Sequence, residues 1–133
     1  MSAKIRKARD YSVVWLIGSA GYSLIEILWR GFTHWTMAVT GGLCFALLYQ
    51  LNLRHPRERM TLKCLRGAAV ITAVEFLVGC IVNLKLKWQV WDYSNSFGNL
   101  LGQVCPLYTA LWFFLCIPVY RLAGGVRRML ARI

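Results

Sequence analysis

The sequence has few acidic residues, few prolines and none of the short motifs that mark common enzyme sites. Its 133 residues include 5 Asp and Glu and 3 Pro, against 16 Lys and Arg. It contains no Walker A loop, no nucleophile elbow and no glycine-rich phosphate turn. The 2 histidines and 5 cysteines show neither zinc-type spacing nor a C-x-x-C pair, so we expect no metal and reduced thiols. These absences argue against an enzyme, and no cofactor is predicted.

Alternating segments of about ten residues, which are typical of membrane β-strands, are also missing. Instead, 58% of the residues are hydrophobic, and the mean hydropathy is +0.50. They gather in blocks that approach the roughly 20 residues needed to cross a bilayer. The blocks are residues 12–29, 35–53, 67–84 and 103–120. We therefore predict an all-α, polytopic membrane protein with four transmembrane helices in a single domain of residues 1–133.

The net charge of +11 is concentrated on one side of this predicted topology. Basic residues cluster before the first block, between the second and third, and after the fourth. The positive-inside rule then places both termini in the cytoplasm. Residues 121–133 mix arginines with apolar side chains, which predicts a C-terminal helix at the membrane surface. This distribution indicates membrane lipids as partners and argues against nucleic acid.

Two of the acidic residues, Glu26 and Glu75, lie inside apolar blocks. A carboxylate within a membrane costs roughly 2.5–3.5 kcal/mol on insertion scales, so such a residue usually faces the protein interior and is functional. Arg30 follows Glu26 at the spacing of an i,i+4 ion pair. Glu75 has no basic neighbour at this spacing, so we expect it to be neutral, or to bind a cation or another helix. The candidate partners for Glu75 are Tyr22, Arg30, Asn83, Gln103 and Tyr108.

The connection between the third and fourth blocks, residues 85–102, is rich in aromatic and amide side chains. Its aromatic residues suit a membrane interface. Asn95, Asn99 and Gln103 follow one another at helical spacing, so a short helix there would present three amides on one stripe. The connection is either a lid over a site or a capped turn between two helices. The candidate substrate-binding residues are Glu26, Arg30, Glu75, Trp91, Asp92, Tyr93, Asn95, Asn99 and Gln103.

A short internal similarity links the two halves of the chain. Leu-Ile-Glu-Ile-Leu at 24–28 corresponds to Ala-Val-Glu-Phe-Leu at 73–77, and Gly-Gly-Leu-Cys at 41–44 corresponds to Gly-Gln-Val-Cys at 102–105. This pattern predicts two hairpins in the same orientation. Transporters are often built from such repeats, with the binding site where the repeats meet.

Residues 74–114 are similar to a bacterial membrane-protein family, the putative ABC-transporter type IV or CmpB-like family. The resemblance rests on E-x-x-x-G at Glu75 and Gly79, W-D-Y-S at 91–94, N-x-x-G-x-V-C at 99–105, Leu111-Trp112, and Glu26 in G-Y-S-L-I-E. The first hairpin departs from the family pattern, because residues 32–35 and 40–42 replace its N-R-G-F-x-x-G-P and P-I-Y-G motifs. Gln103 also stands where the family commonly has a basic residue. Because the first hairpin departs from the pattern, we expect the site in the first half to be altered.

The resemblance implies transport across a bacterial inner membrane, and it does not name a substrate. Because the chain has no ATPase motif, an ABC system would need a separate nucleotide-binding subunit. We expect a small transporter or channel component that carries a cation or small polar solute at a carboxylate site. Four helices enclose little space, so a homodimer is expected to build the path. The alternatives are a non-transporting scaffold or accessory subunit of a larger complex, and an intramembrane lipid-modifying enzyme.

Overall fold

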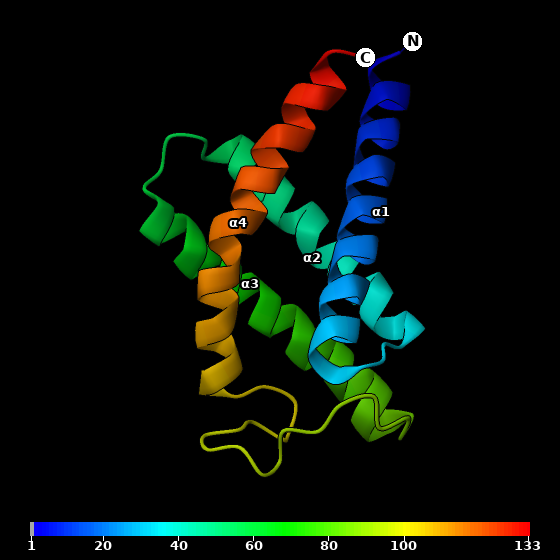
Figure 1. Ribbon diagram of the computed structural model, residues 1–133, viewed down its shortest axis with the longest axis vertical. Coiled ribbons are helices and arrows are strands. Elements are labelled where there is room, and N and C mark those ends of the chain that lie inside the picture. The colour runs from blue at the N-terminus through cyan, green and yellow to red at the C-terminus, as the bar shows by residue number, and fades with distance from the viewer. Residues whose placement is uncertain (1) are drawn as a thin grey trace. The chain divides into compact units, whose positions relative to one another are not determined.

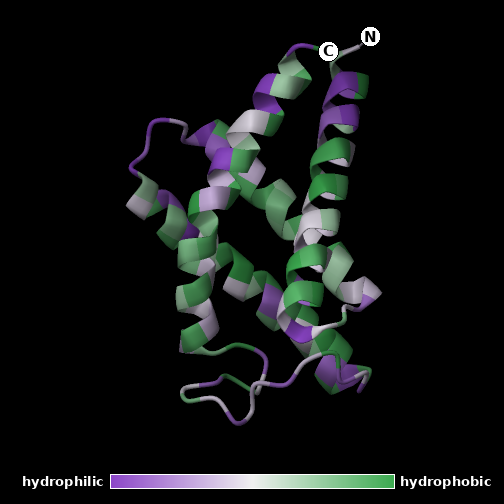
Figure 2. Ribbon diagram, viewed as in Figure 1, coloured by the Kyte–Doolittle hydropathy of each residue, from purple (hydrophilic) through white to green (hydrophobic). Residues whose placement is uncertain are grey.

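A computed structural model describes residues 2–133 and shows a chain of long helices (Figure 1). The elements are α1 (Ala3–Arg30), α2 (Trp35–Arg54), α3 (Met60–Gly79), the π-helical turn η1 (Cys80–Lys85) and α4 (Pro106–Ala131). Across residues 2–133 there is no named β-strand, and four helices are long and apolar enough to cross a membrane. Hydrophilic residues gather at the start of α1 and in the loop between α2 and α3 (Figure 2). The protein is an all-α membrane protein with four transmembrane helices, as predicted.

The chain divides into two compact units. The first contains Met1–Pro56 and Val119–Ile133, and the second contains Arg57–Pro118. Helix α4 therefore begins in the second unit and ends in the first.

In the first unit, α1 and α2 form a tight hairpin because small residues lie between them. A Cβ atom on Gly18 would lie 2.5 Å from the Cβ of Phe45, so no larger residue fits there without a shift. The Ser19 hydroxyl donates to the carbonyl oxygen of Ala38 at 2.7 Å. Small residues permit such close helix contacts within a membrane. The core is completed by the end of α4 and consists of Val14, Phe45, Tyr49, Ala123, Val126 and Leu130.

In the second unit, η1 continues α3, and a long loop then leads to the first half of α4. Helix α4 begins at Pro106, where a residue without an N–H group is readily accommodated. It runs unbroken to Ala131, so the separate surface helix expected over residues 121–133 is the second half of α4.

The short helix suggested by the spacing of Asn95, Asn99 and Gln103 does not form. Backbone φ angles are positive at Leu101 (54°) and at Gly98 and Gly102 (69° and 74°). Such angles are incompatible with a right-handed helix. The three amides therefore do not share one stripe.

Candidate functional site

Glu75 lies on α3, and only 5% of the residue is exposed. Both of its carboxylate oxygens accept hydrogen bonds from neutral side chains. The Tyr93 hydroxyl donates to Oε1 at 2.9 Å, and the indole N–H of Trp112 donates to Oε2 at 2.9 Å. Tyr93 belongs to the loop and Trp112 to α4, so this one carboxylate joins three segments of the second unit.

Three aromatic rings gather at Glu75. The Tyr93 ring stacks on Tyr108 with centroids 4.6 Å apart and planes inclined by 12°. Tyr108 in turn lies 6.2 Å from Trp112, one turn further along α4. We call Glu75, Tyr93, Tyr108 and Trp112 the Glu75 cluster. A carboxylate and the electron-rich faces of aromatic rings both attract cations.

The loop that carries Tyr93 is attached to η1 by Asn83. The Asn83 side chain accepts from the backbone N–H groups of Val90 (2.7 Å) and Trp91 (3.3 Å), and donates to Gln103 Oε1 (2.8 Å). The Trp91 indole donates to the Gln103 carbonyl oxygen at 3.0 Å. A π-helical turn is often found at a functional site, and here it presents Asn83 to the loop. Trp91 and Gln103 are both buried, so they help to pack the loop.

Gly79 allows the loop to approach α3. A Cβ atom at this position would lie 2.6 Å from Gln103 Oε1 and 2.9 Å from Trp91 Cζ2. A side chain on Gly79 would therefore require Trp91 and Gln103, which pack against this position, to shift. The E-x-x-x-G motif thus contains the buried carboxylate of Glu75 and the glycine, Gly79, against which the loop packs.

The remaining polar residues of the loop hold it together. Asp92 Oδ1 accepts from the Ser94 backbone N–H at 2.9 Å, and hydrogen bonds from Ser94 hold the pKa of Asp92 below its usual value. The Asn99 amide donates to the Ser94 and Ser96 carbonyl oxygens, and its Oδ1 accepts from Gly102 N–H at 3.0 Å. Asn95 is exposed, and no side-chain hydrogen bond is found for it across residues 2–133. The loop is therefore an ordered cover that positions Tyr93.

Glu26 belongs to the first unit and is 8% exposed. Its Oε2 lies 3.1 Å from Arg30 Nε, so the i,i+4 ion pair expected from the spacing is present. The two atoms are not aligned for a hydrogen bond with each other, so the contact is an attraction of charges. The Arg30 guanidinium carbon also lies 4.5 Å from the ring centroid of Phe32. Glu26 and Arg30 thus form an ion pair within the last two turns of α1.

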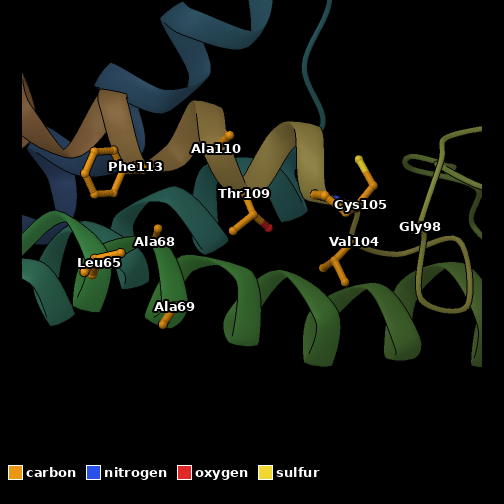
Figure 3. Close-up of a pocket in the computed structure, with 10 residues that line it drawn as sticks. Leu65, Ala68, Ala69, Gly98, Val104, Cys105, Thr109, Ala110 and Phe113 are labelled. Atoms are coloured by element: carbon orange, nitrogen blue, oxygen red, sulfur yellow. The ribbon is translucent and has the colours of Figure 1, made fainter.

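An apolar groove of about 630 Å³ lies in the second unit, lined by α3, the loop and the start of α4 (Figure 3). Its walls include Leu65 and Ala68 from α3 and Phe113 from α4, and Glu75 is not among its lining residues. Thr109, which also lines the groove, shares a hydrogen bond of 2.9 Å with Thr72. Thr72 precedes Glu75 by about one turn of α3. The groove therefore ends close to the Glu75 cluster.

Of the residues expected from the sequence, the structure brings Tyr93 to Glu75, pairs Glu26 with Arg30, and gathers the others in the loop. Trp112 was not predicted from the sequence as a partner of Glu75. The available signal was the Leu111-Trp112 motif, which marks the residue without indicating what its indole contacts. No cluster of three potential metal ligands occurs in the part of the chain that the structure describes.

Residues 11–133 match the family model described as "Putative ABC-transporter type IV". This is the family to which residues 74–114 are similar, and the match extends over all four helices. No curated protein and no solved structure matches the chain.

Proposed function

The chain belongs to the putative ABC-transporter type IV family, and from this premise we propose that it is a membrane component that carries an organic cation. The observation that supports this is the Glu75 cluster. A buried carboxylate supplies one negative charge, and Tyr93, Tyr108 and Trp112 supply ring faces beside it. Proteins bind quaternary ammonium groups with the same combination of groups.

The loop would act as the lid of this site. Stacked rings with centroids 4.6 Å apart leave no room for a solute between Tyr93 and Tyr108. A cation can reach Glu75 Oε1 only when Tyr93 withdraws its hydroxyl. The Trp112 indole keeps hold of Oε2, so the carboxylate stays oriented while the cation replaces the Tyr93 hydroxyl.

The distribution of charge supports a setting for this activity. Basic residues before α1, between α2 and α3 and at the end of α4 favour a bacterial inner membrane with these segments on its cytoplasmic side. A homodimer would complete the path, and a separate nucleotide-binding subunit would supply the energy. The chain itself would have no enzymatic activity.

Binding of choline to the purified protein in neutral-lipid nanodiscs tests this function. The control ligand is 3,3-dimethylbutan-1-ol, which has the shape of choline without its charge. Calorimetry should show choline binding to the wild type and not the neutral analogue. Glu75→Gln should weaken choline binding by at least about tenfold, because it removes the charge in a site of low dielectric.

A matched control and a variant of the lid complete this test. Glu26→Gln makes the same chemical change at the carboxylate paired with Arg30 and should leave choline binding within about twofold of wild type. Tyr93→Phe keeps the ring and removes the hydrogen bond of the lid, so choline should bind faster. Equal binding of the two ligands, or unaltered binding by Glu75→Gln, would contradict the proposal.

A second candidate function, a non-transporting scaffold, is favoured by one observation. Both oxygens of Glu75 already accept hydrogen bonds from the loop and from α4, as expected of a purely structural tie. In that case choline would not bind the wild type. Glu75→Gln, Tyr93→Phe and Trp112→Phe would then only lower the thermal stability of the protein or of its complex.

A further inference from the structure

A second cavity, of about 430 Å³, lies in the first unit between the start of α1 and the end of α2. Three basic side chains line it: Arg6 and Lys7 from α1, and Arg54 from α2. Arg6 and Lys7 lie on one face of α1 together with Asp10, and Arg54 lies one turn beyond Gln50 on α2. Two antiparallel helices thus direct their basic residues into one hollow.

The charges in this cavity do not cancel. Its one acidic lining residue, Asp10, is already bound by Arg9, whose Nη2 and Nε lie 2.7 and 3.0 Å from Oδ1. Arg9 is not among the lining residues. For Arg6, Lys7 and Arg54, no ion pair with a carboxylate is found within residues 2–133. The positive end of α1 and the negative end of α2 meet here and offset each other, so the side chains decide the sign.

Neutral donors complete the lining. Gln50, which carries an amide, and Tyr11, which carries a hydroxyl, line the same cavity. The Tyr11 ring is held edge-on against the Tyr49 ring, with centroids 5.9 Å apart and planes at 81°. Guanidinium, ammonium, amide and phenol groups together are the donors that bind phosphate in proteins.

The position of the cavity indicates the source of the phosphate. It lies at the polar end of two membrane-spanning helices, where lipid headgroups are found and where tyrosine is enriched. We propose that this cavity binds a phosphate group, carried by the headgroup of an anionic membrane lipid. Leu53 and the tyrosine rings provide apolar surface beside the charges for the rest of the lipid.

Native mass spectrometry of the purified protein in detergent tests this site. The probes are phosphatidylglycerol and phosphatidylcholine with the same acyl chains. The triple variant Arg6→Gln, Lys7→Gln, Arg54→Gln should lose at least about tenfold in phosphatidylglycerol binding, because it removes all three basic side chains that line the cavity. The control Lys4→Gln, Arg57→Gln, Arg132→Gln removes the same charge outside the cavity. It should change binding by less than about threefold, because none of these residues lines the cavity and charges outside the site are screened by solvent.

Ala3→Trp provides a test that leaves the charge unaltered, because Ala3 lines the cavity and a large ring there would fill it. It should also abolish the preference for phosphatidylglycerol, with helix content by circular dichroism unchanged. Equal losses in the triple variant and its control would overturn the proposal, and so would full binding by Ala3→Trp. Heat protection by inorganic phosphate tests whether the site accepts free phosphate as well as a lipid headgroup. If phosphate protects the wild type against heat and not the triple variant, the site takes free phosphate as well as lipid.

Discussion

Glu26 and Glu75 have similar local sequences, and both are buried, yet their partners differ in kind. Glu26 pairs with a cation four residues further along the same helix. Glu75 accepts hydrogen bonds from two neutral side chains, which lie 18 and 37 residues away in the chain. The residue four positions later also differs: it is Arg30 after Glu26 and Gly79 after Glu75. A similar local sequence thus predicts burial of the carboxylate, and the fourth residue decides whether its partner is local or distant.

This difference implies that the two sites respond differently to mutation. Removing the Glu75 carboxylate leaves two donors in a buried setting, and each such donor costs about 1–3 kcal/mol. Removing the Glu26 carboxylate leaves Arg30, whose side chain is 23% exposed and can partly turn to water. The Glu75 cluster should therefore contribute more to stability than the Glu26 pair.

The largest expected effect is that of Glu75→Leu. It should lower the free energy of unfolding by about 2–5 kcal/mol, because Tyr93 and Trp112 both lose their acceptor. Unfolding in mixed micelles with increasing denaturing detergent measures this loss. Glu26→Leu, which makes the same change in the other unit, is the control and should cost less than half as much. Equal losses at the two positions would show that the comparison between them is wrong.

Gly79→Ala should have the next largest effect. It tests the role of the residue that follows Glu75 by four positions. A methyl group on Gly79 would lie 2.9 Å from Trp91 Cζ2 and 3.1 Å from Gln103 Cβ, so these two loop residues must shift, and overpacking of this kind costs about 1–3 kcal/mol. Thermal unfolding measures the loss, and protease cleavage between residues 86 and 105 should become faster. Gly21→Ala is the control, since nothing lies within 4 Å of its added Cβ. That change should stabilise α1 by about 0.5–1 kcal/mol.

The sequence predicted those features that depend on neighbours along the chain. The four apolar blocks became α1 to α4, and the spacing of Glu26 and Arg30 predicted their ion pair. The partners of Glu75 were not predictable in this way, because Tyr93 comes from the loop and Trp112 from α4, 18 and 37 residues further along the chain. That loop in turn depends on Asn83 in a π-helical turn, which leaves no periodic signal in the sequence.

A double-mutant cycle on Glu26→Gln and Arg30→Gln measures the interaction energy of the ion pair within α1. The coupling should be about 1 kcal/mol or less, because the pair is partly exposed and the two atoms are not aligned for a hydrogen bond. It should fall further when the salt concentration is raised. The equivalent cycle on Glu75→Gln and Trp112→Phe should give a larger coupling that salt leaves unaltered. A salt-sensitive coupling at Glu75 would indicate that water and ions reach this carboxylate, contrary to its burial.

The smallest expected effect belongs to Asp92, which lies in the loop that brings Tyr93 to Glu75. Hydrogen bonds from Ser94 lower the pKa of Asp92 from its usual 3.8 in the folded protein, so folding favours the carboxylate form. The stability that these bonds provide is present above the usual pKa and is lost as the pH falls through the lowered value. The temperature of thermal unfolding should therefore fall more steeply between pH 6 and pH 3 for the wild type than for Asp92→Asn. The asparagine keeps an acceptor oxygen and does not titrate. Because Asp92 is exposed, the difference should be small and confined to the acid end. Parallel curves for the two proteins would show that Asp92 does not hold the loop, and that Asn83, Trp91 and Gln103 position Tyr93 without it.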